Sequence, residues 1–269
     1  MRKTKIYSAV VLAVAYSAVS PSVPAAGPQP LAQVAGQAAR ATAVEPGAIA
    51  ALDRMAGYLR VLRAFQIQAA ITIDEVLADG QKVELESQAN LIAQRPDRLR
   101  LEVASDRQQR FFFYDGKAFT LWAPRTSYYA TVTAPPTLLE LADMLEEKYD
   151  IELPLVDLFR WGTPESDRAA ITAAKYIGPS AVGGITCEQY AFRQSGLDWQ
   201  IWIQGGDYPL PRKVVLTTTT DEARPRYAAV YTWNLAPSYD AGAFTFVPEG
   251  DAHRITIEEV APARTRPNP

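Results

Sequence analysis

Residues 65–91 read FQIQAAITIDEVLADGQKVELESQANL, and apolar side chains alternate with polar ones in both halves of this stretch. Ile67 and Ile71 belong to the apolar series of the first half, and Leu85 and Leu91 to that of the second. Alternation with a period of two is typical of a strand with one apolar face. Asp79-Gly80 lies between the halves and is a strong hairpin signal. The stretch therefore predicts an antiparallel hairpin with one dry face and one wet face.

The same alternation recurs in short segments through most of the chain. Together they predict an antiparallel meander of about eleven strands. Twelve segments carry this pattern, at 65–74, 83–91, 98–103, 111–114, 118–122, 128–132, 186–193, 198–204, 212–220, 226–235, 244–247 and 254–259.

A leading helix is expected over residues 46–63. Apolar residues recur there at steps of three and four, which is the period of an amphipathic helix: Ile49, Leu52, Met55 or Ala56, Leu59 and Leu62. Pro46 fits the first helical turn, where its missing N–H costs nothing.

A second helix is expected in the middle of the strand series, over residues 137–149. Its leucines share one face, and Thr137 with Glu140 fits a capping box. The following residues 153–161 are densely apolar and flanked by prolines. This segment must be covered by another part of the protein, or must itself cover one.

These elements predict an α+β fold that is mainly β and forms one domain over residues 46–260. A long antiparallel sheet tends to curl toward a barrel, and two amphipathic helices are natural covers for its apolar face. The helices either plug the sheet into a dry core or leave a cavity for an apolar ligand. Residues 26–45 and 261–269 are rich in alanine, glycine or proline and are expected to be flexible.

The first 25 residues have the pattern of a cleaved signal peptide. Arg2, Lys3 and Lys5 precede an apolar run at 6–19 that is shorter than the ~20 residues of a membrane-spanning helix. Small residues before Ala25 fit a signal-peptidase site. No cysteine follows the run, which excludes lipidation there. A soluble periplasmic protein is expected.

Composition excludes several classes of function. The signal holds three of the 27 basic residues and none of the 30 acidic ones, so the remainder is mildly acidic, which argues against nucleic acid as a partner. Cys187 and His253 are the single cysteine and histidine, too few for a typical zinc site. Glu84 and Glu86 share a strand face, where paired carboxylates are ordinary surface unless a cleft perturbs them. No metal, cofactor or catalytic residue is predicted.

Several segments together resemble an uncharacterised family of predicted periplasmic proteins, which is similar in architecture to the lipoprotein carriers LolA and LolB. The resemblance covers about residues 45–258, and no single motif carries it. The segments are 52–65 (LDRMAGYLRVLRAF), 95–100 (RPDRLR), 113–117 (FYDGK), 136–158 (PPTLLELADMLEEKYDIELPLVDL), 182–187 (VGGITC), 198–203 (DWQIWI) and 209–213 (PLPRK).

The resemblance implies a half-open antiparallel barrel with a leading helix and an inserted lid helix over a hydrophobic cavity. It also implies an arginine that ties the lid closed, for which Arg95 and Arg98 are the candidates. Both also fit solvated strand-edge charges. This chain is longer than the carriers and its inserted segment is bulkier. The residues expected to line the cavity or lid are Ile71, Leu85, Leu101, Phe111, Phe113, Leu121, Leu138, Leu141, Leu145, Leu158, Trp199 and Ile201.

Three functions follow as hypotheses. The first is a periplasmic carrier or binder of lipid-like or acylated ligands, without catalysis. The second is an envelope sensor or scaffold that binds a lipoprotein or a membrane-bound protein through the same half-barrel. The third and weakest is a hydrolase that uses a carboxylate or His253. The sequence leaves the cargo and the oligomeric state open.

Overall fold

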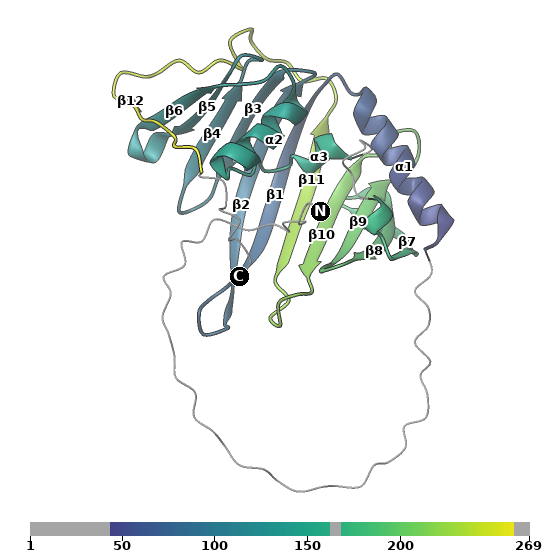
Figure 1. Cartoon of the computed structure of the whole chain (residues 1–269). Coiled ribbons are helices and arrows are strands. Elements are labelled where there is room, and N and C mark those ends of the chain that lie inside the picture. Colours follow the sequence, from purple (N-terminus) through teal and green to yellow (C-terminus); the bar gives the residue numbers. More distant parts are fainter. Residues whose placement is uncertain (1–43, 162–167, 261–269) are drawn as a thin grey trace, which may run out of the picture. The chain divides into compact units, whose positions relative to one another are not determined.

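One twelve-stranded sheet carries the fold in the computed structural model, which describes residues 44–161 and 168–260 (Figure 1). The strand order is β12-β6-β5-β4-β3-β2-β1-β11-β10-β9-β8-β7. The strands are β1 (Ala64–Val76), β2 (Lys82–Gln94), β3 (Arg98–Ala104), β4 (Gln109–Tyr114), β5 (Ala118–Ala123), β6 (Tyr128–Thr133), β7 (Ala173–Val182), β8 (Ile185–Gln194), β9 (Leu197–Gln204), β10 (Pro211–Thr218), β11 (Arg226–Asn234) and β12 (His253–Arg254). Short 3₁₀ turns lie at η1 (Pro124–Thr126) and η2 (Arg168–Ala170).

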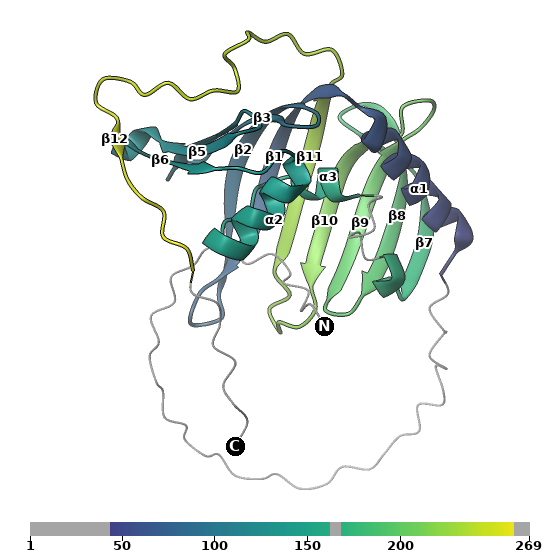
Figure 2. The same cartoon turned by 45° about the horizontal axis from the view of Figure 1, so that its top comes forward.

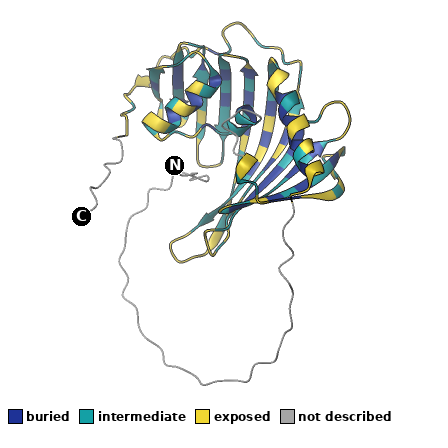
Figure 3. Cartoon of the chain, turned by 45° about the vertical axis from the view of Figure 1, so that its right-hand side comes forward, coloured by how far each residue is buried: buried dark blue, intermediate teal, exposed yellow. Residues whose placement is uncertain are grey.

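Two antiparallel meanders, β1–β6 and β7–β11, meet where β1 pairs with β11. The outermost strands are β12, which runs parallel to β6, and β7, so the sheet is open. The sheet curves, and the helices lie on its inner side (Figures 2 and 3). The predicted mainly-β fold with a half-open sheet is confirmed.

The leading helix, α1 (Pro46–Val61), ends two residues earlier than predicted. Pro46 stands in its first turn, as expected, and Leu62 at its C-cap is already extended, which directs the chain into β1. The helix contacts β7 and α3 (Asp157–Arg160). Its buried residues are Ala48, Ala51, Leu52, Met55, Ala56 and Leu59.

The inserted helix, α2 (Leu138–Tyr149), begins with the predicted capping box. The Thr137 hydroxyl accepts a hydrogen bond from the Glu140 N–H at 3.3 Å and donates to the Glu140 carboxylate at 2.8 Å. The apolar segment that follows contains the four-residue helix α3 and covers the sheet, as its composition predicted. Its buried residues are Leu153, Leu155, Leu158 and Phe159.

The edge strand β7 is missing from the sequence prediction, because Gly178-Pro179 looks like a strand breaker. Gly178 has a φ of 139°, and the pairing with β8 shifts between Tyr176 and Gly178. Pro179 has no N–H to donate, which an edge strand tolerates because one of its sides is unpaired. The edge position therefore tolerates both the proline and the irregularity.

The predicted strand 244–247 is wrong. Residues 244–247 alternate as a strand would, but this segment is an irregular strap that lies against the sheet. Phe246 packs on Phe113, Trp122 and Tyr129, with ring centroids 5.0–5.5 Å apart. The next predicted strand, 254–259, is reduced to β12.

The sheet has an inner face, which the helices cover, and an outer face. Phe65 identifies the inner face, because its ring lies 5.8 Å from that of Phe159 in α3. Strand register places Ala93, Leu99 and Tyr114 in the same row as Phe65. The strap with Phe246 lies on the outer face.

The predicted signal peptide, the lead-in up to residue 43 and the tail at 261–269 lie outside the described residues. Within the described ranges, none of the helices has the length and apolar character needed to cross a bilayer.

Candidate ligand-binding site

The inner face of the central strands is apolar along β1, whereas Ser87 interrupts the apolar series of β2 opposite Ile71. At one end Ile67 and Leu91 are fully buried, whereas Ile73 and Leu85 toward the β1–β2 turn are only half-buried. Figure 1 shows α2 and α3 over the part of these strands away from that turn. The inner-facing residues of β1, β2, β11, β10 and β9 include Ile67, Ala69, Ile71, Ile73, Leu85, Ala89, Leu91, Tyr227, Ala229, Tyr231, Trp233, Val214, Leu216, Trp199 and Ile201.

Most of the predicted cavity and lid residues do lie on this side of the sheet or in the helices that cover it. Buried on the inner face are Ile71, Leu101 and Ile201, and half-buried there are Leu85, Leu121 and Trp199. Leu138, Leu141 and Leu145 form the buried face of α2, and Leu158 is buried in α3.

The prediction that Phe111 and Phe113 line the cavity is wrong, because both side chains face outward. Phe112 between them points inward, and register pairs Phe111 with Trp122 and Phe113 with Thr120 on the outer face. Three successive phenylalanines conceal the alternation of the strand. The partner that shields the outward rings, Phe246, is more than a hundred residues away in the sequence, so no local signal could have indicated it.

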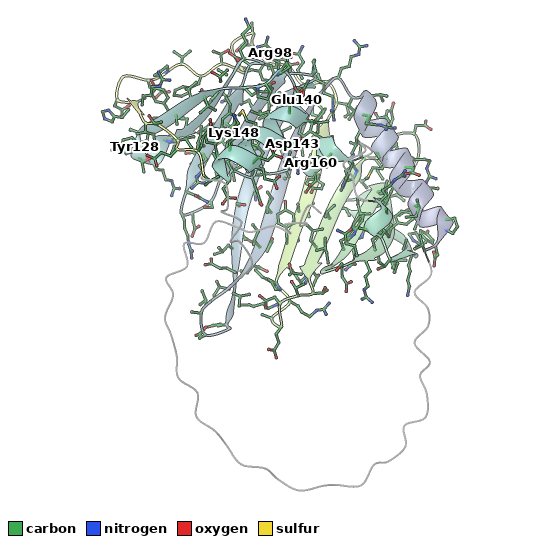
Figure 4. All side chains as sticks on the ribbon, viewed as in Figure 1. Arg98, Tyr128, Glu140, Asp143, Lys148 and Arg160 are labelled. Carbon is green, nitrogen blue, oxygen red and sulfur yellow. The ribbon has the colours of Figure 1, made fainter. Side chains whose placement is uncertain are left out.

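Helices α2 and α3 are joined by charged side chains near the surface. Arg160 Nη2 donates to Asp143 Oδ1 at 2.9 Å and to Glu146 Oε2 at 3.2 Å. Figure 4 shows Arg160 and Asp143 together on the helices. The carboxylates are 52% and 38% exposed, and such pairs contribute about 0–1 kcal/mol each. They tie one helix to the other.

Of the two tether candidates, Arg95 contacts the helices. Its guanidinium carbon lies 5.0 Å from the centre of the Phe159 ring in α3. Burial lowers the pKa of Arg95. Arg98 lies at the upper end of the sheet (Figure 4), and its nearest carboxylate is that of its neighbour Asp97, at 3.7 Å.

Three polar side chains that sequence reasoning missed lie together between α3 and β11. Burial raises the pKa of Asp157, and Arg160 opposes this more weakly. Burial also raises the pKa values of Tyr227 and Tyr231, and the Asp157 carboxylate adds to both shifts. Only their inner-facing register, once the pairing of β11 is known, identifies the two tyrosines.

The residues considered for catalysis are spread over the outer surface. Glu84 and Glu86 are exposed on the outer face of β2. His253 is exposed in β12, with its ring 6.0 Å from that of Tyr128, and nearby Asp251 accepts a hydrogen bond from Ser127. In the described part of the chain, no three His, Cys, Asp or Glu side chains are grouped to hold a metal ion.

Two shallow hollows lie on the outer face. One, of about 260 Å³, is under the strap between Phe113, Tyr129 and Phe246. The other, of about 300 Å³, is lined by polar residues that include Gln68 and Glu102. The predicted cavity is a different space, on the inner face, and it stays a prediction.

A family model described as "Predicted periplasmic protein (DUF2092)" matches residues 48–258. The chain belongs to this family. The family resemblance predicted from the sequence is therefore confirmed, and the description agrees with a periplasmic location. No curated protein matches the chain significantly.

Solved structures similar to this DUF2092 chain are distant in sequence. An uncharacterized conserved protein from Thermus thermophilus is 12% identical with a TM-score of 0.44, over 78% of this chain and 99% of that one. LprF from Mycobacterium bovis is 11% identical with a TM-score of 0.44, over 73% and 96%. A LolA superfamily protein from Nitrosomonas europaea is 10% identical with a TM-score of 0.34, over 74% and 97%. No functional statement follows from these likenesses.

Proposed function

We propose that this protein is a periplasmic carrier or binder of lipid-like or acylated ligands, which it holds on the inner face of the half-barrel without catalysing a reaction. The observation that carries the proposal is the continuity of the apolar inner face. It runs from the buried centre of β1 and β2 to the half-buried Ile73 and Leu85.

An acyl chain gains most from such a surface. Each methylene removed from water contributes about 0.8 kcal/mol, and the contact needs no directional partner. Ile73, Leu85 and Tyr227 offer apolar contact along one end of the face while keeping part of their surface accessible. The inner face is therefore suited to a ligand that binds mainly through its alkyl chain.

The cover over this face is suited to movement. Helix α2 docks through Leu138, Leu141 and Leu145, while its links to α3 are exposed ion pairs. We propose that α2 and α3 open together as a lid. The contact of Arg95 with Phe159 would then be the tether that closes it, and Arg98 is the less suitable candidate.

The proposal includes export, with cleavage of a signal peptide after Ala25 and release of a soluble protein. Lipidation is not part of it, because Cys187 lies inside β8. The intact mass of protein recovered from the periplasm tests this. A mass that includes residues 1–25, or an acyl adduct, would contradict the export scheme.

A dye-displacement titration tests ligand binding. An apolar fluorescent naphthylamine should bind to the purified protein and be displaced by oleate. Ile73→Asn should weaken binding about tenfold, because it removes apolar contact on the inner face. Thr72→Asn is the matched control, since Thr72 is the preceding residue on the outer face. Equal effects of the two substitutions, or no dye binding at all, would contradict the proposal.

A sensor or scaffold that binds a protein partner is the second candidate, and the edge strand β7 favours it. Tyr176 and Ile177 are 46% and 52% exposed on this edge strand. Val44 and Glu45 already bond to its outer side at Ala174 and Tyr176, so strand addition would use the part of β7 that follows Tyr176. A photocrosslinking residue at position 177 should then give one defined protein adduct in cells. Absence of an adduct, together with lipid binding, favours the carrier.

A further inference from the structure

Arg95 is a half-buried cation without a counter-anion in the part of the chain that the structure describes. Its Nε is inaccessible to solvent and has no hydrogen-bond partner. Burial alone accounts for the lowered pKa of the guanidinium, with no contribution from a carboxylate. By contrast, the Nε of the buried Arg212 donates to Gln204 at 2.9 Å.

Leaving the Nε–H of Arg95 without an acceptor lowers the stability of the folded protein. A buried N–H without an acceptor loses its hydrogen bond to water and gains none from the protein, and the partial burial of the charged guanidinium adds to this cost. The Phe159 ring offers a cation–π contact, which offsets only part of this cost. Such an arrangement is expected where an anion completes the set of partners.

Arg95 also lies at the covered end of the apolar inner face. It continues the inner-facing series Leu91 and Ala93 beyond β2. Its N–H donates to the Arg63 carbonyl at 2.7 Å, and the next carbonyl, that of Pro96, accepts from Leu138 at the start of α2. The α1–β1 link, the end of β2 and both lid helices therefore meet here.

The distance from this end to the more accessible end suits an amphiphile. The strip from Leu85 to Arg95 spans roughly 33 Å of extended chain, which is enough for a stretched acyl chain. A tail along the strip would place its polar head at one end, and Arg95 is the charged group at the covered end.

We propose that Arg95 binds the acidic head group of the ligand, a carboxylate or a phosphate, so that this protein prefers anionic amphiphiles to neutral lipids. The inference rests on the proposed function, because it assumes that an acyl tail occupies the inner face. It assigns to Arg95 a direct contact with the ligand in addition to the contact with Phe159.

The test compares three probes on the purified protein: oleate, oleyl alcohol and acetate. The wild type should bind oleate about ten- to hundredfold more tightly than oleyl alcohol, since a charge-assisted hydrogen bond distinguishes the two. Arg95→Gln should remove this preference, so that oleate and oleyl alcohol bind to the variant with similar affinities. Arg98→Gln is the matched control and should keep the preference.

The comparison of two ligands within each variant cancels any general effect of Arg95→Gln on the lid. Equal affinities of the wild type for oleate and oleyl alcohol would overturn the proposal without needing a variant. A preference that survives Arg95→Gln, or acetate binding as tight as oleate, would also overturn it. If neither long-chain probe binds, the proposed function itself fails.

Discussion

Truncation of one buried leucine in α2 should show whether this helix opens separately from the sheet. Leu145 is fully buried, so Leu145→Ala should lower the free energy of opening α2 by about 2–5 kcal/mol. The three docking leucines contribute roughly 5–9 kcal/mol before the cost of ordering the helix, so this loss is a large share of the free energy that holds α2 on the sheet.

Native-state hydrogen exchange measures this opening. The α2 amides should exchange about 30-fold faster or more in Leu145→Ala than in the wild type. Ile201→Ala is the matched control, because Ile201 is equally buried but lies in β9. It should weaken protection of the sheet amides and leave that of α2 unchanged, since the lid opens without unfolding β9. If α2 and the sheet lose protection together in both variants, α2 unfolds only with the whole domain and the lid is refuted.

Three further predictions concern single side chains. Tyr114 donates to the Pro135 carbonyl at 2.5 Å, and chiefly burial raises its pKa to about 12. The unfolded chain releases this proton near pH 10, so the free energy of unfolding of the wild type should fall from about pH 10 to about pH 12. In urea unfolding, Tyr114→Phe should cost about 1 kcal/mol at pH 8 and should make the alkaline loss of stability smaller. Because burial raises the pKa of Asp157, ionisation of this carboxyl opposes folding at neutral pH. Asp157→Asn should therefore raise the melting temperature at pH 7. This gain in melting temperature should shrink as the pH falls from the pKa of Asp157 in the folded protein toward its pKa in the unfolded chain. Phe246→Ala should release the strap, seen as faster proteolysis between residues 236 and 252, while dye binding on the inner face stays unchanged.

The sequence was sufficient to locate a helix or strand wherever that element carries a regular pattern of apolar residues. The helical period and the Thr137–Glu140 box located α2, and alternation located most strands. Sequence patterns failed to predict a segment where its position in the fold overrides the local conformational preference of its residues. Gly178-Pro179 is tolerated only because β7 is an edge strand, and the spacing of Phe244 and Phe246 reflects packing on the outer face rather than strand pairing.

Sequence patterns likewise identified some residues of the candidate site and missed others. Periodicity identified inner-facing residues such as Ile71 and Ile201, because one face of a strand must be dry. It could not separate Arg95 from Arg98, since they are three residues apart where β2 turns into β3, and only their contacts in the fold differ. Asp157 also gave no signal, because its burial depends on how α3 docks.

Photolabelling with an alkyl-diazirine fatty acid tests most directly whether the inner face holds an acyl chain. After irradiation and digestion, the account predicts adducts on the inner-facing residues of β1 and β2, including Ile73 and Leu85, and loss of these adducts when unlabelled oleate competes. Labelling confined to the outer face around Phe113 and Phe246, or labelling that oleate does not compete for, would contradict it.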